Sequence, residues 1–92
     1  MEKKVIVVGD PTTHGGQVIS GSLTQKIEGK PVARLGDLVN CPLFYPGGKP
    51  HGVNKIIEGE PGCMVDGLPI ALEGHKTECG CALIGTVSST VS

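Results

Sequence analysis

Histidine and cysteine side chains are the residues of this chain best suited to chemistry. The 92 residues include three His and four Cys. Structural zinc sites hold the metal in a tetrahedron of four Cys or His ligands. The chain has no Cys-x-x-Cys pair, so local spacing alone is a weak signal for a metal. The main candidate ligands are His14, Cys41, His51, His75 and Cys79.

The other two cysteines are weaker candidates. Cys63 falls within a predicted strand and is typical of a small buried hydrophobic residue. Cys81 is separated from Cys79 by a single glycine, and we expect one metal ion not to take both thiols.

An internal repeat places several candidate ligands at equivalent positions. Residues 21–41 match residues 59–79, and a third, partial copy begins at Gly9. His14, Cys41 and Cys79 each lie four residues after the equivalent positions of the three units. A metal-competent side chain therefore recurs three times, which favours a structural metal over three independent space-filling residues. The matched pairs are Gly21/Gly59, Gly29/Gly67, Pro31/Pro69, Ala33/Ala71, Gly36/Gly74 and Cys41/Cys79.

The middle unit carries an insertion, Pro42–Pro50, which is rich in Pro and Gly and contains both aromatic residues. We expect it to be an exposed loop. His51 follows the insertion and precedes a glycine, as His14 and Cys79 do, which adds it to the candidate ligands.

The elements that must position these residues are predicted to be strands. The chain contains 15 Gly and 7 Pro, and its longest stretch without either, Met1–Val8, is too short for a typical helix. Short apolar segments bounded by Gly or Pro indicate an all-β fold with tight hairpins at 27–30 and 65–68. The predicted strands are 5–8, 18–19, 32–35, 53–57, 64–65, 70–72 and 82–84.

Composition excludes several classes of function. A net charge of −1, one Phe, one Tyr and no Trp offer nucleic acid neither a basic face nor a stacking surface. No apolar run approaches the ~20 residues of a membrane span, and the apolar stretch that ends at Val8 is too short for a signal peptide. We expect one cytoplasmic domain over residues 1–92, in which a metal compensates for a small core.

Several motifs, in order along the chain, resemble those of PAAR-repeat proteins. They are Asp10-Pro-Thr-Thr-His-Gly-Gly16, Ile19-Ser-Gly-Ser22, Gly29-Lys-Pro-Val-Ala-Arg-Leu-Gly-Asp37, Pro50-His-Gly52 and Glu78-Cys-Gly-Cys81. The Pro-Ala-Ala-Arg motif of the family name appears as Pro31-Val-Ala-Arg34 and, degraded, as Pro69-Ile-Ala-Leu72. The resemblance covers essentially the whole chain.

The resemblance implies a small β-structured cone with pseudo-threefold repeats that caps the trimeric VgrG spike of a type VI secretion system. Family members hold one zinc ion near the apex with three His and one Cys. Carried over to this chain, the ligands would be His14, His51, His75 and Cys79, and it stays open whether Cys41 replaces His75 or Cys79.

The implied role is mechanical: a monomeric chain, one per VgrG trimer, sharpens the spike for membrane piercing. It would reside in the cytoplasm before firing and be delivered outside the cell or into a target cell. We expect no enzymatic activity and no toxin within these residues, so any effector would bind separately.

Two other functions remain open at this point. One is a zinc-stapled adaptor that binds another protein. The other is a small metallo-hydrolase, which would need a zinc with one open coordination position. The chain has no His-Glu-x-x-His motif, and Asp10 and Asp37 are typical of turn carboxylates rather than general acids. The sequence does not decide between zinc and iron.

Overall fold

The computed structural model describes residues 3–91, and all regular elements in this range are strands. The predicted all-β class is therefore confirmed. The strands pair in antiparallel fashion as β1–β9, β2–β5–β6, β3–β4 and β7–β8. Their bounds are β1 Lys3–Lys4, β2 Gln17–Val18, β3 Lys26–Ile27, β4 Lys30–Pro31, β5 Leu38–Phe44, β6 Pro50–Lys55, β7 Glu60–Val65, β8 Leu68–Ile70 and β9 Thr90–Val91.

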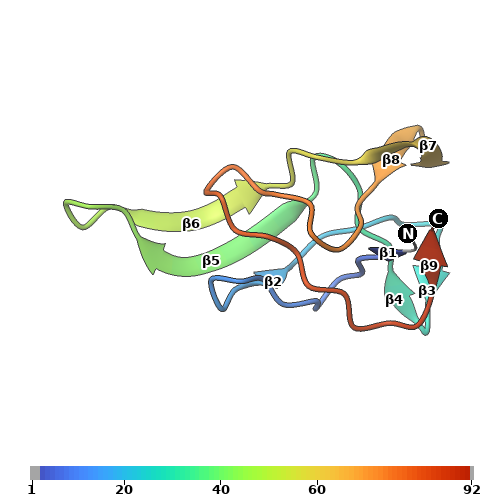
Figure 1. Cartoon of the computed structure of the whole chain (residues 1–92), viewed down its shortest axis with the longest axis horizontal. Coiled ribbons are helices and arrows are strands. Elements are labelled where there is room, and N and C mark those ends of the chain that lie inside the picture. Colours follow the sequence, from blue (N-terminus) through green and yellow to red (C-terminus); the bar gives the residue numbers. More distant parts are fainter. Residues whose placement is uncertain (1–2, 92) are drawn as a thin grey trace.

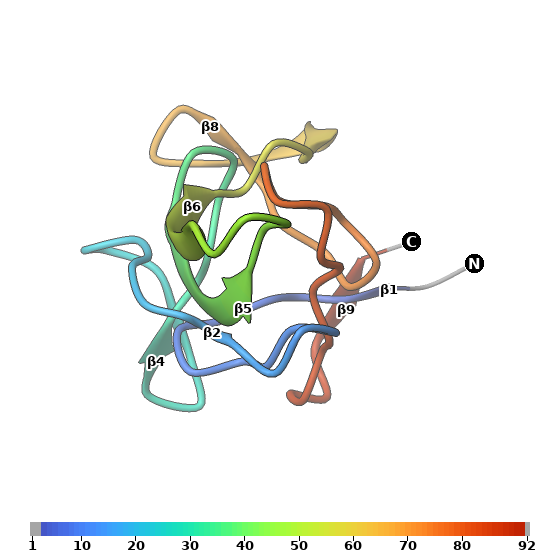
Figure 2. The same cartoon turned by 90° about the vertical axis from the view of Figure 1, so that its left-hand side faces the viewer.

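The molecule is elongated, with principal extents of 39 × 27 × 22 Å. Figure 1 shows the β5–β6 hairpin projecting alone at one end, while β1–β9, β3–β4 and β7–β8 gather at the other. Seen from the hairpin end, these three pairs are spread around the long axis (Figure 2). One end is thus narrow and the other broad.

The two tight hairpins predicted at an acidic residue followed by glycine are confirmed as β3–β4 and β7–β8. Glu28 and Gly29 have φ angles of 53° and 79°, and Asp66 and Gly67 have φ angles of 54° and 80°. Two successive residues with positive φ are what a two-residue turn needs to match the twist of its strands.

A closed ring of backbone hydrogen bonds relates the three repeated units. The N–H of Ile6 donates to the carbonyl of Ala71 at 3.1 Å, that of Ala71 to Ala33 at 3.0 Å, and that of Ala33 to Ile6 at 2.8 Å. Each segment therefore pairs with two neighbours around a pseudo-threefold axis. For this reason the predicted strands 5–8, 32–35 and 70–72 form isolated bridges rather than ladders, except that Ile70 ends β8.

Side chains along the first of these segments alternate between two buried clusters, as expected for an extended chain. Val5 and Val7 face one cluster, and Ile6 and Val8 face the other. The first also contains Val32, Val65, Ile70, Leu72 and Val87, and the second contains Val18, Ala33, Val39, Ile56, Ala71 and Leu83. The cores are small because every member is aliphatic.

The insertion Pro42–Pro50 is exposed, as predicted, but it is more ordered than a loop. Its first residues continue β5 and its last begins β6, with a register shift between Cys41 and Phe44. Among residues 3–91, no helix is long and apolar enough to cross a membrane.

Candidate metal centre

Three equivalent turns set the directions from which the ligands approach. Each turn contains a glycine with φ near 90°, namely Gly9, Gly36 or Gly74. A residue with a Cβ rarely adopts this φ, so glycine is needed there. The side chain of the residue after the glycine accepts a hydrogen bond from the backbone N–H of the residue three positions earlier. The donor and acceptor pairs are Val7 to Asp10 Oδ2 at 3.0 Å, Arg34 to Asp37 Oδ2 at 2.7 Å, and Leu72 to His75 Nδ1 at 3.0 Å.

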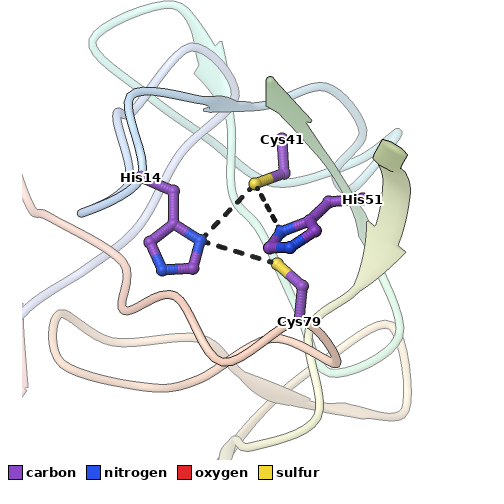
Figure 3. Close-up of side chains that lie close together, drawn as sticks. All are labelled: His14, Cys41, His51 and Cys79. Atoms are coloured by element: carbon purple, nitrogen blue, oxygen red, sulfur yellow. Dashed lines mark hydrogen bonds between the residues drawn. The ribbon is translucent and has the colours of Figure 1, made fainter. Parts of the chain in front are cut away.

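Four residues beyond these acceptors, the three units present His14, Cys41 and Cys79 to one another, and β6 adds His51 (Figure 3). The ligand atoms of these four residues all lie within 4.8 Å of one another. Cys41 Sγ is 3.2 Å from His51 Nδ1 and 3.5 Å from His14 Nδ1, and Cys79 Sγ is 4.0 Å from His14 Nδ1.

These separations fit one tetrahedral metal ion. Bond lengths of about 2.3 Å to sulfur and 2.0–2.1 Å to nitrogen place neighbouring ligand atoms roughly 3.3–3.8 Å apart. The three sulfur–nitrogen distances, 3.2, 3.5 and 4.0 Å, lie within or close to that range. Two imidazoles and two thiols form a donor set that suits zinc and other thiophilic metals.

The two cysteines of this group differ in their proton affinity. Burial raises the pKa of the Cys41 thiol. Burial also acts on Cys79, but hydrogen bonds from the Thr77 hydroxyl and the Cys81 backbone outweigh it and lower the pKa of Cys79. The thiolate is the form that binds a metal, and Cys79 reaches it more readily.

Contacts around His51 fix its position. Its ring packs against Tyr45 with centroids 4.0 Å apart and lies 5.6 Å from the His14 ring. The side-chain amide of Asn54 donates to the carbonyl of His51 at 2.9 Å, which restrains the backbone of β6 at His51. The residue that follows the insertion is thus a fourth candidate ligand, held from both sides.

The structure places His75 outside this group and Cys41 inside it. His75 occupies the turn position of Asp10 and Asp37, and its Nδ1 accepts the N–H of Leu72. The repeat contained the signal for this arrangement, because it makes Cys41, and not His75, equivalent to His14 and Cys79. Burial lowers the pKa of His75, which favours the neutral ring that can accept this bond.

The two weaker candidates also lie outside the group. Cys63, in β7, packs against the first buried cluster. Cys81 is fully buried and hydrogen-bonds Thr77 Oγ1 at 2.9 Å. Its Sγ is nevertheless 3.7 Å from that of Cys79, because the intervening Gly80, with φ 89°, turns the chain.

A comparison with known families finds a match over most of the chain. The family model of the PAAR motif matches residues 8–85, which include all four members of the group. The chain belongs to the PAAR-motif family. Its Pro31-Val-Ala-Arg34 segment ends in an arginine whose Nε lies 2.9 Å from Asp37 and whose guanidinium also pairs with Asp66 at 3.1 Å. No curated protein matches the chain.

Membership in the PAAR family supports a protein of the spike-tip type of type VI secretion. Arg34 links the turn at Asp37 to the β7–β8 hairpin at Asp66, so the motif residue joins two repeated units. In the other copy Leu72 takes this position and lies in the first buried cluster.

Proposed function

We propose that this chain is the structural tip of a type VI secretion spike and caps a trimeric VgrG-like protein. The family match carries this proposal. The chain acts mechanically, as a non-enzymatic point that sharpens the spike for membrane piercing. It is a monomer in the cytoplasm before firing, joins the spike as one copy per trimer, and leaves the cell on it, with any effector bound separately.

The broad end of the molecule supports a threefold partner. Three antiparallel pairs, β1–β9, β3–β4 and β7–β8, lie there around the axis (Figures 1 and 2). A single chain with a pseudo-threefold base can present similar contacts to each subunit of a trimer. Strand edges at this base gain partners when they meet the strands of the spike.

We also infer that the metal is one structural zinc ion held by His14, Cys41, His51 and Cys79. The four donors would complete a tetrahedron, which leaves no open position for a substrate or an activated water. The donors come from all three units and from β6, so the ion would join parts of the chain that are distant in sequence.

Metal analysis and X-ray absorption test this ligand set. The purified protein is expected to contain one zinc per chain with two sulfur and two nitrogen ligands. Cys41→Ser should lose most of the zinc, while Cys63→Ser, outside the group, should retain it. A shell of one sulfur and three nitrogens would instead favour a set containing His75, and a bound water would favour a catalytic metal.

Co-purification with a VgrG-like trimer tests the capping role. One chain per three VgrG chains is expected. Leu68→Glu changes a partly exposed residue of β8 at the broad end and should weaken the complex. Leu43→Ser, in β5, should leave it intact. Failure of the wild-type chain to bind any trimeric spike, or equal binding by both variants, would argue against capping through the broad end.

A further inference from the structure

The β5–β6 hairpin carries exposed apolar side chains at the narrow end of the molecule. Leu43 and Phe44 end β5 and Tyr45 follows them, while Val53 lies further back on β6, opposite Asn40. Phe44 is 65% exposed and Val53 is 58% exposed. Residues 43–50, beyond the Cys41–Gly52 pair, are here called the hairpin tip.

The hairpin tip also has an unusual charge pattern. No Asp or Glu occurs between residues 38 and 57, although the whole chain contains nine. Lys49 lies within the tip, while Lys55 lies at the base of the hairpin, where its backbone N–H donates to the Glu78 carboxylate at 2.8 Å. The tip is therefore cationic and apolar, while the net charge of the chain is −1.

Its aromatic residues suit a lipid interface. Phe44 is the only Phe and Tyr45 the only Tyr of the chain, which has no Trp. Tyr is enriched where an apolar environment meets water, because its ring is apolar and its hydroxyl is polar. The Tyr45 ring packs on the ring of His51, so the tip is in contact with the candidate metal group.

We propose that the hairpin tip inserts its apolar edge into the interface of a lipid bilayer, with a preference for anionic phospholipids. This inference rests on the proposed function, which directs the narrow end toward a membrane. Phe44 and Leu43 enter the headgroup–acyl boundary, and Lys49 pairs with lipid phosphate.

A bilayer fits this edge better than a protein surface does. A stable protein interface usually involves roughly 20–30 residues on each side. The tip is a single two-stranded hairpin that projects away from the rest of the chain (Figure 1). A lipid surface can accept a few projecting apolar side chains without a complementary shape.

Vesicle binding by the full chain tests the proposal. Vesicles of phosphatidylcholine alone are compared with vesicles that also contain phosphatidylglycerol. Because Tyr45 is the only Tyr and the chain lacks Trp, its emission reports the tip directly. Wild-type protein should co-sediment with the anionic vesicles, and brominated lipids should quench Tyr45.

Three variants locate the contact. Phe44→Ser should weaken vesicle binding roughly tenfold or more, since it removes a large apolar side chain from the interface. Lys49→Gln should weaken binding to the anionic vesicles about fivefold. Leu23→Ser removes another exposed apolar side chain, outside the hairpin, and should bind as wild type does.

Two results would overturn the proposal: no vesicle binding by the wild-type chain, or equal binding by Phe44→Ser and Leu23→Ser. Loss of self-association in Phe44→Ser with vesicle binding unchanged would make the edge a protein interface instead. Trimer capping is measured separately, so a chain that caps the spike but ignores vesicles refutes only this inference.

Discussion

The Nδ1 atom of His75 accepts the Leu72 N–H at 3.0 Å, where the two equivalent turns use the carboxylates of Asp10 and Asp37. Only a neutral imidazole can accept at this nitrogen, because both nitrogens of the charged ring are donors. Burial lowers the pKa of His75, and Lys3 adds to this effect, while Glu58 and Glu60 oppose it.

His75→Asp should restore the carboxylate of the other two turns without loss of metal. Since folding lowers the pKa of His75 from 6.5, its neutral form stabilises the fold fully above pH 6.5. That contribution declines as the pH falls toward the lowered value. The wild type should therefore lose more stability than His75→Asp as the pH falls below 6.5.

Thermal unfolding across this pH range, together with zinc analysis, measures the comparison. Protonation of metal ligands affects both proteins alike, so the difference between them isolates residue 75. If His75→Asp lost its metal, His75 would be a ligand after all.

Residue types alone could not separate ligands from turn residues. The sequence supported His14, His51 and Cys79 as candidates, and the structure brings these three together with Cys41. A histidine can either bind a metal or accept a backbone N–H, and only the position of its ring in the fold decides between these roles. The repeat makes Cys41 equivalent to Cys79, and the structure places both in one group.

At the scale of elements, local turns were more predictable than strand pairing. The β3–β4 and β7–β8 hairpins follow from two-residue turns at Glu28-Gly29 and Asp66-Gly67. Segment 5–8 could not be assigned correctly from its apolar pattern, because its partners lie in two other repeats. The inserted residues 42–50 form the far end of the β5–β6 hairpin, because the two strands continue to pair beyond Cys41, as far as Phe44 and Pro50.

The contact of β2 with β5 places Cys41 beside His14, and it depends on a close approach at Gly16. A Cβ atom on Gly16 would lie 1.9 Å from the carbonyl oxygen of Asn40, the residue before Cys41. Backbone atoms cannot give way as a flexible side chain can. The two segments would have to separate, and Cys41 would move with β5.

Gly16→Ala should therefore lower stability by about 1–3 kcal/mol, as overpacking does, and reduce metal occupancy. Gly62→Ala is the matched control, because its Cβ would meet only the Glu60 carboxylate oxygen, at 3.1 Å. Chemical denaturation and zinc analysis of both variants give the comparison. Full zinc occupancy in Gly16→Ala would show that the β2–β5 contact does not hold the metal group.

For the whole molecule, we propose that residues 1–92 form one domain whose parts unfold together. The ring at Ile6, Ala33 and Ala71 joins the three units through the backbone, and the two aliphatic clusters pack around it. The candidate metal ligands belong to the same three units. Both cores are small, so the metal should contribute a large share of the stability.

Removal of the metal should then weaken the entire molecule rather than the β5–β6 hairpin alone. A ligand present at a thousand times its Kd stabilises the folded state by about 4 kcal/mol, and a chelator removes that contribution. Tyr45 fluorescence reports the metal group, and far-ultraviolet circular dichroism reports the strands. With EDTA, the unfolding midpoints measured by both signals should fall together. Hydrogen exchange at the amides of Ile6, Ala33 and Ala71 should accelerate. The opening free energy derived from it should fall by an amount similar to the loss of stability. If Tyr45 alone responded while these ring amides stayed protected, the metal would stabilise only the narrow end, and the three units would hold together through their aliphatic clusters and backbone ring.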